Sequence, residues 1–436
     1  MKKLFTRRNI VIALGSAFAV GLAIFFFTKN LPLEDNSTKE ILPNPKNDEP
    51  VHVVSTATIG STGDILIHSP FLPAYYDETT QSHNFDKIFT HLEPYIKKLD
   101  YSVINLEVTL ADKNFSGYPL FRCPDSLIDS AKNCGFDMFL TATNHSNDGG
   151  ASGFTRTVEV LKNKNVDFIG TRLNSDDKKY IIKDINGIKV GMVNYTYGDI
   201  SGDGVVSVNG IPATSANSRL INVFDYNKLE KFYSEQAEII AEMNQLGANK
   251  IIYYMHWGNE YQLKPNATQK AIAQKLCDLG VDVIVGGHPH VIQPMDVLHS
   301  DISGKDTICI YSVGNSVSNQ RQEIMDMKSG HTEDGVLFNV AFTKLSDGTV
   351  LTSDLDVLPT WVHLYRGNNG KKVYQIVPLD RSVDWSSNFN LNATSNGIER
   401  ANKSYNRTMQ LLSEGQQKAK NLLSQRLKEA YPHLYE

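Results

Sequence analysis

Short apolar runs alternate with segments of helical periodicity along most of the chain. Five of these runs stop at a polar or glycine-containing turn, namely Thr56–Ile59, Tyr101–Leu106, Met138–Ala142, Lys250–Met255 and Val281–Val285. Apolar residues recur at helical spacing between them, over Phe85–Leu99, from Ser126, over Asp225–Leu246 and over Thr268–Leu279. Strands that alternate with helices in this way predict an α/β fold.

Antiparallel pairs interrupt this alternation. Tyr180–Asp184 and Lys189–Tyr195 predict a hairpin that turns at Asn186-Gly187, so the sheet is mixed. Further along, a group of alternating segments is predicted to complete a second sheet: Val336–Lys344, Val350–Leu358 and Lys372–Pro378. Gly397–Tyr431 is predicted to be an amphipathic helix, which either packs on the domain surface or docks on a membrane partner.

The amino terminus has the pattern of a membrane segment. Four basic residues precede Ile10–Phe27, an uncharged run of eighteen residues that is long enough to cross a bilayer as a helix. Basic flanks stay in the cytoplasm, which predicts a single-pass anchor with everything after Lys29 outside. A cleaved signal peptide is the alternative, because Ala17-Phe18-Ala19 has small residues at cleavage spacing. Asn30–Pro50 is rich in proline and polar residues and is predicted to be a solvated spacer.

Composition excludes two broad classes of protein. The 436 residues are 41% hydrophobic and 21% charged, which excludes a chain that is disordered overall. After residue 29 there are 38 basic residues against 48 acidic ones, which argues against a general nucleic-acid binder. The four cysteines form no C-x-x-C pair, so no thiolate zinc site is indicated, although Cys123 and Cys134 flank a short helix and could be bridged. The predicted domains are an anchor (1–29), the spacer (30–50), a main domain (51–390) and a helical extension (391–436).

Polar side chains of metal-binding type gather where the predicted strands stop. They are Asp64, His68, Glu107, Asn144, His145, His256, His288 and His290. Because ligands of open α/β sheets collect at the carboxyl ends of strands, we expect these side chains to converge in one cleft. Oxygen and imidazole ligands without thiolates suit Mn, Fe, Zn or Mg, and this number of ligands is enough for two ions. The polar stretch Gly198–Ser218 lacks periodicity and is predicted to be a long loop at the rim of this cleft.

Each of these residues also has an ordinary structural interpretation. A lone strand-end histidine is often solvated, and Asn144 could serve as a turn residue. For Asp148 we favour the structural role, as the cap of a helix that carries Phe154, Val158 and Leu161. His145 follows Asn144 directly and points elsewhere, so one could bind metal while the other acts as an acid or hydrogen-bond donor.

The ordered motifs resemble those of the poly-γ-glutamate capsule-synthesis proteins (CapA/PgsA type), relatives of the calcineurin-like metallophosphoesterases. The resemblance covers about residues 54–317 and rests on Gly63-Asp64 with His68, Asn105-Leu106-Glu107, Thr143-Asn144-His145, His256-Trp257-Gly258-Asn259-Glu260-Tyr261, Gly287-His288-Pro289-His290 and Tyr311-Ser312-Val313-Gly314-Asn315. It implies a four-layer α-β-β-α sandwich. It also implies a membrane-anchored extracellular position at the bacterial surface.

The resemblance further implies a ligand set. One metal would be held by Asp64, His68, Glu107 and His290, and a second by Glu107, Asn144, His256 and His288, with His145 beside them as the catalytic acid or transition-state donor. Three positions depart from the related families. Thr143 and Gly287 stand where the capsule family often has Asn and His, and Glu107 stands where phosphoesterases carry a bridging Asp.

Three functions follow from this resemblance. As a capsule factor, the protein would act with the membrane subunits of a poly-γ-glutamate synthase, as a metal-dependent hydrolase or phosphoesterase-like enzyme on polyglutamate or a phosphate ester. As an independent extracellular phosphoesterase, it would hydrolyse phosphate esters without any effect on capsule. As a scaffold of the synthase complex, it would need no metal ligands.

Overall fold

The computed structural model describes residues 50–432. The predicted membrane segment Ile10–Phe27 lies outside the described residues, as do residues 433–436 and, apart from Pro50, the predicted spacer. Within the described range, no helix combines the length and the apolar character that crossing a membrane requires.

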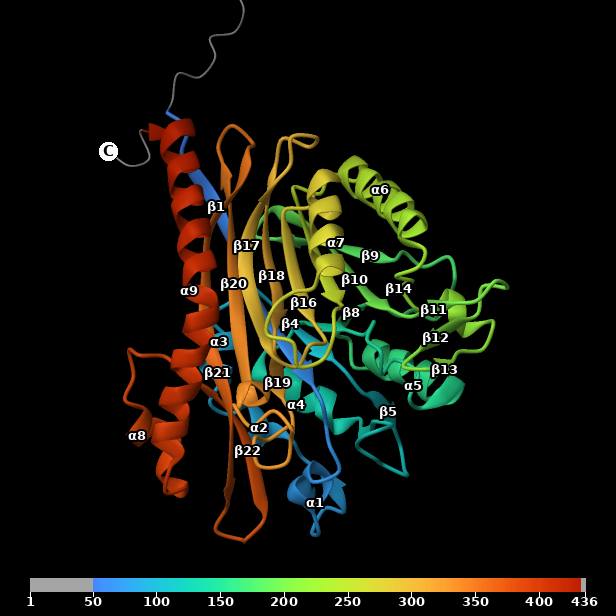
Figure 1. Ribbon diagram of the computed structural model, residues 1–436, viewed down its shortest axis with the longest axis vertical. Coiled ribbons are helices and arrows are strands. Elements are labelled where there is room, and N and C mark those ends of the chain that lie inside the picture. Colours follow the sequence, from blue (N-terminus) through green and yellow to red (C-terminus); the bar gives the residue numbers. More distant parts are fainter. Residues whose placement is uncertain (1–49, 433–436) are drawn as a thin grey trace, which may run out of the picture. The chain divides into compact units, whose positions relative to one another are not determined.

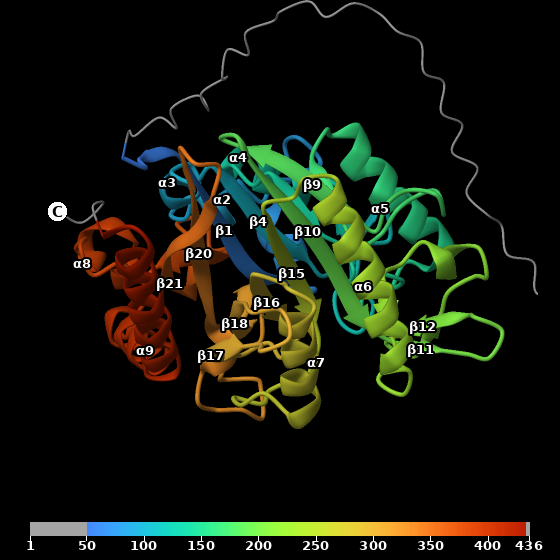
Figure 2. The same cartoon turned by 90° about the horizontal axis from the view of Figure 1, so that it is seen from above.

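Two mixed sheets form the centre of the fold (Figures 1 and 2). The first has the order β22 (Lys372–Pro378), β21 (Val350–Arg366), β20 (Asp334–Leu345), β1 (Val53–Ile65), β4 (Tyr101–Leu106), β7 (Met138–Leu140) and β8 (Asp167–Ile169), with β19 (Asn315–Val317) paired to β1. The second has the order β14 (Val223–Phe224), β10 (Ile188–Tyr197), β15 (Lys250–His256), β16 (Val283–Gly287), β18 (Asp306–Val313) and β17 (Ile292–His299), with β9 (Tyr180–Ile185) paired to β10. In each sheet the strands that lead to the predicted ligands run parallel.

Helices cover the outer faces of both sheets. Those outside the first sheet are α1 (Phe71–Tyr75), α2 (Asp86–Phe89), α3 (Glu93–Ile96), α4 (Ser126–Cys134) and α5 (Gly150–Asn163), and those outside the second are α6 (Leu229–Gln245) and α7 (Ala267–Asp278). The apolar core between the sheets contains side chains of both, such as Val103, Phe338 and Met192. The predicted four-layer α-β-β-α sandwich is therefore confirmed.

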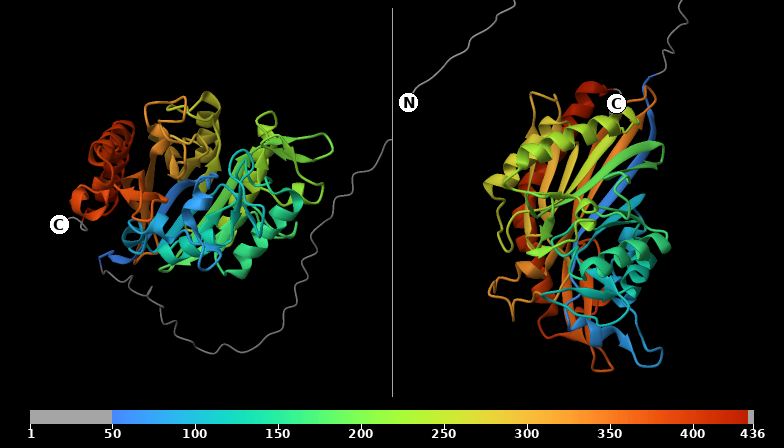
Figure 3. Two further views of the ribbon diagram at one scale, coloured as in Figure 1. Left: turned by 90° about the horizontal axis from the view of Figure 1, so that it is seen from below. Right: turned by 90° about the vertical axis from the view of Figure 1, so that its right-hand side faces the viewer.

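The carboxyl-terminal helix α9 (Gly397–Ala430) runs along one side of the strands, next to the short helix α8 (Trp385–Asn388) (Figure 3, left). It packs on β21 of the first sheet and β17 of the second, and Leu412 and Leu423 enter the core between the sheets. The approach is close, because a Cβ atom on Gly415 would lie 2.1 Å from the Met295 carbonyl oxygen. The helix thus closes one side of the sandwich, as in the surface-packing alternative.

Several sequence predictions are confirmed and others need correction. The hairpin of β9 and β10 turns at Asn186-Gly187, where both residues have positive φ angles. The predicted helix Phe85–Leu99 is instead two short helices, α2 and α3, because Pro94 in the first turn of α3 favours a new helix start. Cys123 and Cys134 are buried free thiols.

Strand pairing accounts for two further corrections, one between distant segments and one within a predicted loop. The three carboxyl-terminal strands do not complete the second sheet, because β20 pairs with β1 and extends the first. The predicted loop Gly198–Ser218 contains a small sheet of β11 (Asp199–Ile200), β12 (Val206–Val208) and β13 (Ile211–Pro212), followed by a 3₁₀ turn, Asn217–Arg219. Two smaller strand pairs are β2 (Tyr76–Asp77) with β3 (Ser82–His83), and β5 (Thr109–Ala111) with β6 (Arg122–Pro124).

Candidate metal centre

Seven of the predicted site residues lie at the same end of the two sheets, and none is more than 4% exposed. They are Asp64 on β1, Glu107 after β4, Asn144 and His145 after β7, His256 on β15, and His288 and His290 after β16. The carboxyl ends of parallel strands meet there, so the side chains come from both sheets. The rings of His256 and His288 are 4.9 Å apart between centroids, which agrees with the predicted convergence in one cleft.

Carboxylate and imidazole atoms form three groups that could each hold a metal ion. Within each group, the candidate ligand atoms all lie within 4.8 Å of one another. The groups are Asp64–Glu107–His290, Glu107–His256–His288 and Glu260–His288–His290. Glu107 belongs to two of them, with its Oε1 atom 3.3 Å from His256 Nε2 and 3.8 Å from His290 Nε2. The Glu107 carboxylate is thus shared by two neighbouring sets of candidate ligand atoms.

Hydrogen bonds fix the orientation of Asp64. Its Oδ1 atom accepts from Asn105 Nδ2 at 2.6 Å, and its Oδ2 atom accepts from the backbone N–H of His288 at 3.1 Å. His290 Nδ1 lies 3.2 Å from the same Oδ2 atom. Burial by itself raises the pKa of Asp64, but the hydrogen bond from His290 and the nearby imidazoles outweigh burial and lower it.

Glu107 lacks the partners that a buried carboxylate needs. Within the described chain, neither of its oxygens accepts a hydrogen bond, and both are inaccessible to solvent. Burial, together with the negative charges of Asp64 and Glu260, raises the pKa of Glu107 well above its ordinary value. An uncompensated buried carboxylate is costly unless a cation neutralises it. The surroundings of Glu107 therefore fit a bound divalent cation.

Two of the imidazoles near Glu107, those of His256 and His288, are in the neutral form that binds metals. Burial lowers the pKa of His256 to about 3 and the pKa of His288 well below its ordinary value, so both are neutral at physiological pH. His288 Nδ1 is buried without a hydrogen-bond partner among the described residues. Asn144 Oδ1 lies 2.8 Å from His256 Nε2, so the amide oxygen adjoins the second ligand group.

The backbone holds two of these ligands in an uncommon conformation. His288 and His290 have φ angles of 91° and 55°, in the left-handed region that non-glycine residues rarely adopt. Such strained residues persist where the surrounding structure holds them, and they concentrate at functional sites. The strain agrees with a functional role for the turn after β16.

His145 forms a pair with Asp148 that the sequence did not predict. His145 Nδ1 lies 2.7 Å from Asp148 Oδ2, which also accepts the backbone N–H of Phe121 at 2.7 Å. Because a carboxylate only accepts hydrogen bonds, Nδ1 carries the proton and Nε2 is left to interact elsewhere. The predicted cap role of Asp148 is wrong, since α5 starts after Gly149 and has no side-chain cap.

His68 stands apart from the three ligand groups and is only partly buried. Its Nδ1 atom lies 3.2 Å from the Leu66 carbonyl oxygen and 3.3 Å from the backbone nitrogen of Asn319. Its ring meets the edge of Phe121, which also contacts His145. The structure thus places His68 near His145 rather than among the grouped ligand atoms.

Acid should destabilise the metal-free protein through His68. Burial lowers the pKa of His68 to about 4, below the ordinary value of 6.5, so the unfolded chain binds a proton that the folded chain does not. Stability is therefore retained above pH 6.5 and falls toward pH 4, by at most about 1.4 kcal/mol per pH unit. Urea unfolding of the His68→Asn variant in chelator should show a shallower loss over this range, and an identical slope would contradict the assignment.

A cleft of about 660 Å³ opens beside the three candidate ligand groups. Its lining includes His68, His145, Glu260 and the loop residues Asn209 and Ile211, so the predicted rim position of Gly198–Ser218 is found. Three exposed apolar side chains also line it: Tyr118, Leu120 and Ile324. Since no lysine or arginine is among the described residues of this lining, bound metal would be the main attraction for an anionic ligand.

Three functional candidates were missed or undervalued from sequence. Glu260 joins His288 and His290 in the third ligand group, although it is exposed. Asn105 contacts both Asp64 and His256, and Asp148 holds His145. Glu260 and Asn105 lie within the motifs quoted above, so their position in those motifs was the available signal.

Comparison with known structures returns low similarity. A 5′-nucleotidase precursor from Thermus thermophilus aligns with a TM-score of 0.40 and 15% identity, over 70% of this chain and 54% of that one. The calcineurin-like phosphoesterase YfkN from Bacillus subtilis aligns with a TM-score of 0.38 and 16% identity, over 80% and 97% of the two chains. At these TM-scores the likeness carries no inference about activity.

Comparison of sequences is more informative. Capsule biosynthesis protein CapA of Bacillus anthracis is 28% identical over 313 residues, which are 69% of this chain and 66% of the relative. PGA biosynthesis protein CapA of Bacillus subtilis (strain 168) is 26% identical over 264 residues, or 59% and 62% of the two chains. The chain thus spans slightly less than two thirds of each relative. Residues 58–320, more than half of the chain, match the family described as "Bacterial capsule synthesis protein PGA_cap", and the chain belongs to this family.

Proposed function

We propose that this protein acts in the synthesis or export of a poly-γ-glutamate capsule, as a metal-dependent hydrolase or phosphoesterase-like enzyme. Membership of the capsule synthesis family supports the process. The observation that carries the chemistry is the buried Glu107 carboxylate, which has no hydrogen-bond partner in the described chain and is shared by two groups of candidate ligand atoms. The substrate would be polyglutamate itself or a phosphate ester.

The donor set assigns ligands to two positions. Asp64, Glu107 and His290 would hold one divalent ion, and Glu107, Asn144, His256 and His288 would hold a second, with Glu260 available from the cleft side. Such ions, when bound, supply a Lewis acid and lower the pKa of coordinated water to about 7. Mn, Fe, Zn and Mg all accept these oxygen and imidazole ligands.

The chain's own catalytic group would be His145. Asp148 holds the proton on His145 Nδ1, so Nε2 is the nitrogen that exchanges a proton with the substrate. The rings of Phe121 and His145 meet edge to face, with their centroids 4.8 Å apart, and both His145 and Asp148 are buried.

Deleting the gene tests the proposal. Loss of surface polyglutamate, restored by the wild-type gene, is expected if the protein is a capsule factor. Intact capsule in the deletion strain, together with metal-dependent ester hydrolysis by the purified protein, would instead support an independent phosphoesterase.

The proposal includes a location outside the cytoplasm and association with the membrane subunits of a synthase. Its basis is the basic flank and apolar run at Ile10–Phe27. Protease added to intact cells should therefore degrade the main domain and leave a small membrane-bound fragment. Complete protection, or a mature amino terminus near Val20, would contradict a retained anchor.

A further inference from the structure

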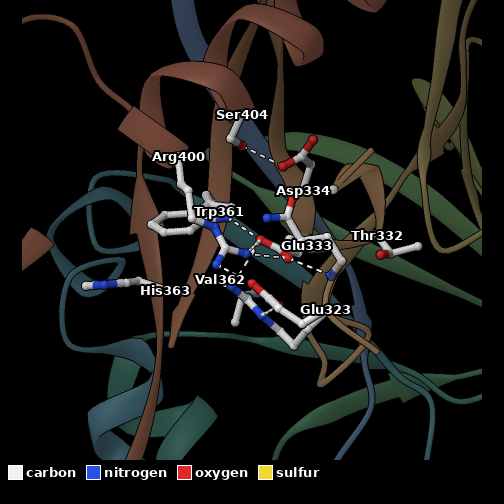
Figure 4. Close-up of polar contacts among 12 residues, drawn as sticks. Glu323, Thr332, Glu333, Asp334, Trp361, Val362, His363, Arg400 and Ser404 are labelled. Atoms are coloured by element: carbon white, nitrogen blue, oxygen red, sulfur yellow. Dashed lines mark hydrogen bonds and ion pairs between the residues drawn. The ribbon is translucent and has the colours of Figure 1, made fainter. Parts of the chain in front are cut away.

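Three consecutive residues connect α9 with the metal centre. Thr332, Glu333 and Asp334 lie at the end of a 3₁₀ turn (His331–Glu333) and the start of β20, and each is at most 1% exposed. Figure 4 shows Glu333 beside Arg400 and Asp334 beside Ser404, both of which belong to α9. Buried polar groups of this kind need partners. Glu333 and Asp334 have partners on α9, whereas Thr332 has its partners in Asn315 and Gln320.

Glu333 receives its partners mainly from arginines. Arg400 Nη2 donates to both carboxylate oxygens, at 2.6 and 2.7 Å, and Arg321 Nη2 lies 3.0 Å from Oε2. Trp361 Nε1 donates to Oε2 at 2.9 Å, and the guanidinium group of Arg400 lies near the Trp361 ring (Figure 4). The guanidinium group of Arg321 also lies over this ring. Charge-assisted hydrogen bonds are stronger than neutral ones, so these contacts hold Glu333 firmly to α9, to Arg321 and to Trp361 of β21.

Asp334 adds a second attachment to the same helix. Ser404 Oγ donates to Asp334 Oδ1 at 2.6 Å, and Arg407 donates to both carboxylate oxygens. Arg400, Ser404 and Arg407 fall on successive turns of α9, so one face of the helix holds residues 333 and 334.

Thr332 connects the residues held by α9 with the candidate metal centre. Its carbonyl oxygen accepts from Asn315 Nδ2 at 3.0 Å, and its hydroxyl donates to the Gln320 carbonyl oxygen at 2.7 Å. Gln320 Oε1 accepts from the same Asn315 amide at 2.9 Å. The amide is thereby fixed with its oxygen 3.1 Å from His290 Nδ1, while His290 Nε2 faces Glu107.

We propose that α9 is a positioning element of the metal centre, which orients His290 through residues 332–334 and Asn315, and that Arg400 is a positioning residue. The inference rests on the metal site proposed above. Groups that hydrogen-bond a ligand's second ring nitrogen orient it, and changing them typically lowers metal affinity about 10- to 100-fold. Arg400 does not contact His290 itself and reaches Asn315 only through Glu333 and Thr332. A smaller effect on metal affinity is therefore expected from its loss.

The test compares variants of the full chain by Mn²⁺ titration calorimetry. Arg400→Met leaves Arg321 to neutralise Glu333, and should raise the Mn²⁺ dissociation constant about 3- to 10-fold, less than Asn315→Ala. Arg400→Lys keeps one charge-assisted bond to Glu333 and should recover part of the affinity, and it replaces Arg400→Met if that variant does not fold. In ¹⁵N-histidine-labelled, metal-free protein, the ring resonances of His290 should shift in Arg400→Met.

Lys418→Met is the matched control, because Lys418 lies on the same helix and pairs with Asp296 at the surface. It should leave both the dissociation constant and the His290 resonances unchanged. If Arg400→Met lowers the unfolding temperature but changes neither quantity, the cluster only stabilises the fold and the proposal is wrong. If the wild type binds no Mn²⁺, the proposed metal function fails, whereas the His290 resonances still decide whether α9 positions this residue.

Discussion

Glu107→Gln is expected to abolish metal binding and, at the same time, to stabilise the metal-free protein. Glu107 belongs to two ligand groups, so its loss should weaken binding by more than about 100-fold, beyond the range for a ligand's hydrogen-bond partner. Without metal, the ionised carboxylate is buried beside Asp64, which raises its pKa. Folding stability is therefore lost as the pH rises above 4.5, and glutamine removes this loss.

Thermal unfolding at pH 8 checks both effects in one experiment. In chelator, Glu107→Gln should unfold at a higher temperature than the wild type. With Mn²⁺ at 100 times its dissociation constant, the order should reverse, because binding stabilises the wild type alone by about 2.7 kcal/mol. Glu260→Gln is the control, since Glu260 is exposed and belongs only to the third group. An unchanged order with and without Mn²⁺ would exclude Glu107 as a shared ligand.

His145→Ala should separate catalysis from metal binding. His145 lies outside the three ligand groups and is held by Asp148, so the variant should keep its metal. A general acid typically contributes about 10² to 10⁴ in rate, and activity should fall by that factor. His288→Ala should lose metal as well as activity. Metal content by elemental analysis, measured beside capsule restoration in a deletion strain, distinguishes the two variants.

Asp148→Asn refines this prediction. The amide keeps the shape of the carboxylate but can turn an N–H donor toward His145 Nδ1, which would move the ring proton to Nε2, so activity should fall while metal content stays at the wild-type level. Full restoration of capsule by His145→Ala would show that the catalytic assignment is wrong. Restoration by His288→Ala without bound metal would show that the protein serves as a scaffold in capsule synthesis.

Local sequence patterns were sufficient for the strands that lead to the site and for the place where most site residues gather. A β-branched run that stops at Gly286-Gly287 puts His288 and His290 at a strand end, whatever the rest of the chain does. The same holds for Glu107 after β4 and His256 on β15. Since parallel strands direct their carboxyl ends to one edge, local placement already predicts the cluster.

Local patterns failed where one residue had two plausible partners. Asp148 precedes glycines and a helix, which is a capping pattern, yet its carboxylate binds His145 and the Phe121 backbone. His68 follows Asp64 closely in sequence but contacts Asn319, which is 251 residues away. The partner of each side chain depends on which distant segments come together when the chain folds.

The α/β class, the polar residues at strand ends and the family motifs could all be read from the amino-acid sequence, because hydrophobic periodicity and short motifs are properties of neighbouring residues. The folded structure was needed to establish that β20–β22 extend the first sheet, that α9 closes one side of the sandwich, and that residues 332–334 connect α9 with Asn315. These features rest on pairing and burial between segments tens to hundreds of residues apart. The free energy that stabilises these contacts comes from packing and from charge neutralisation away from water. Neither can be predicted from a local sequence pattern.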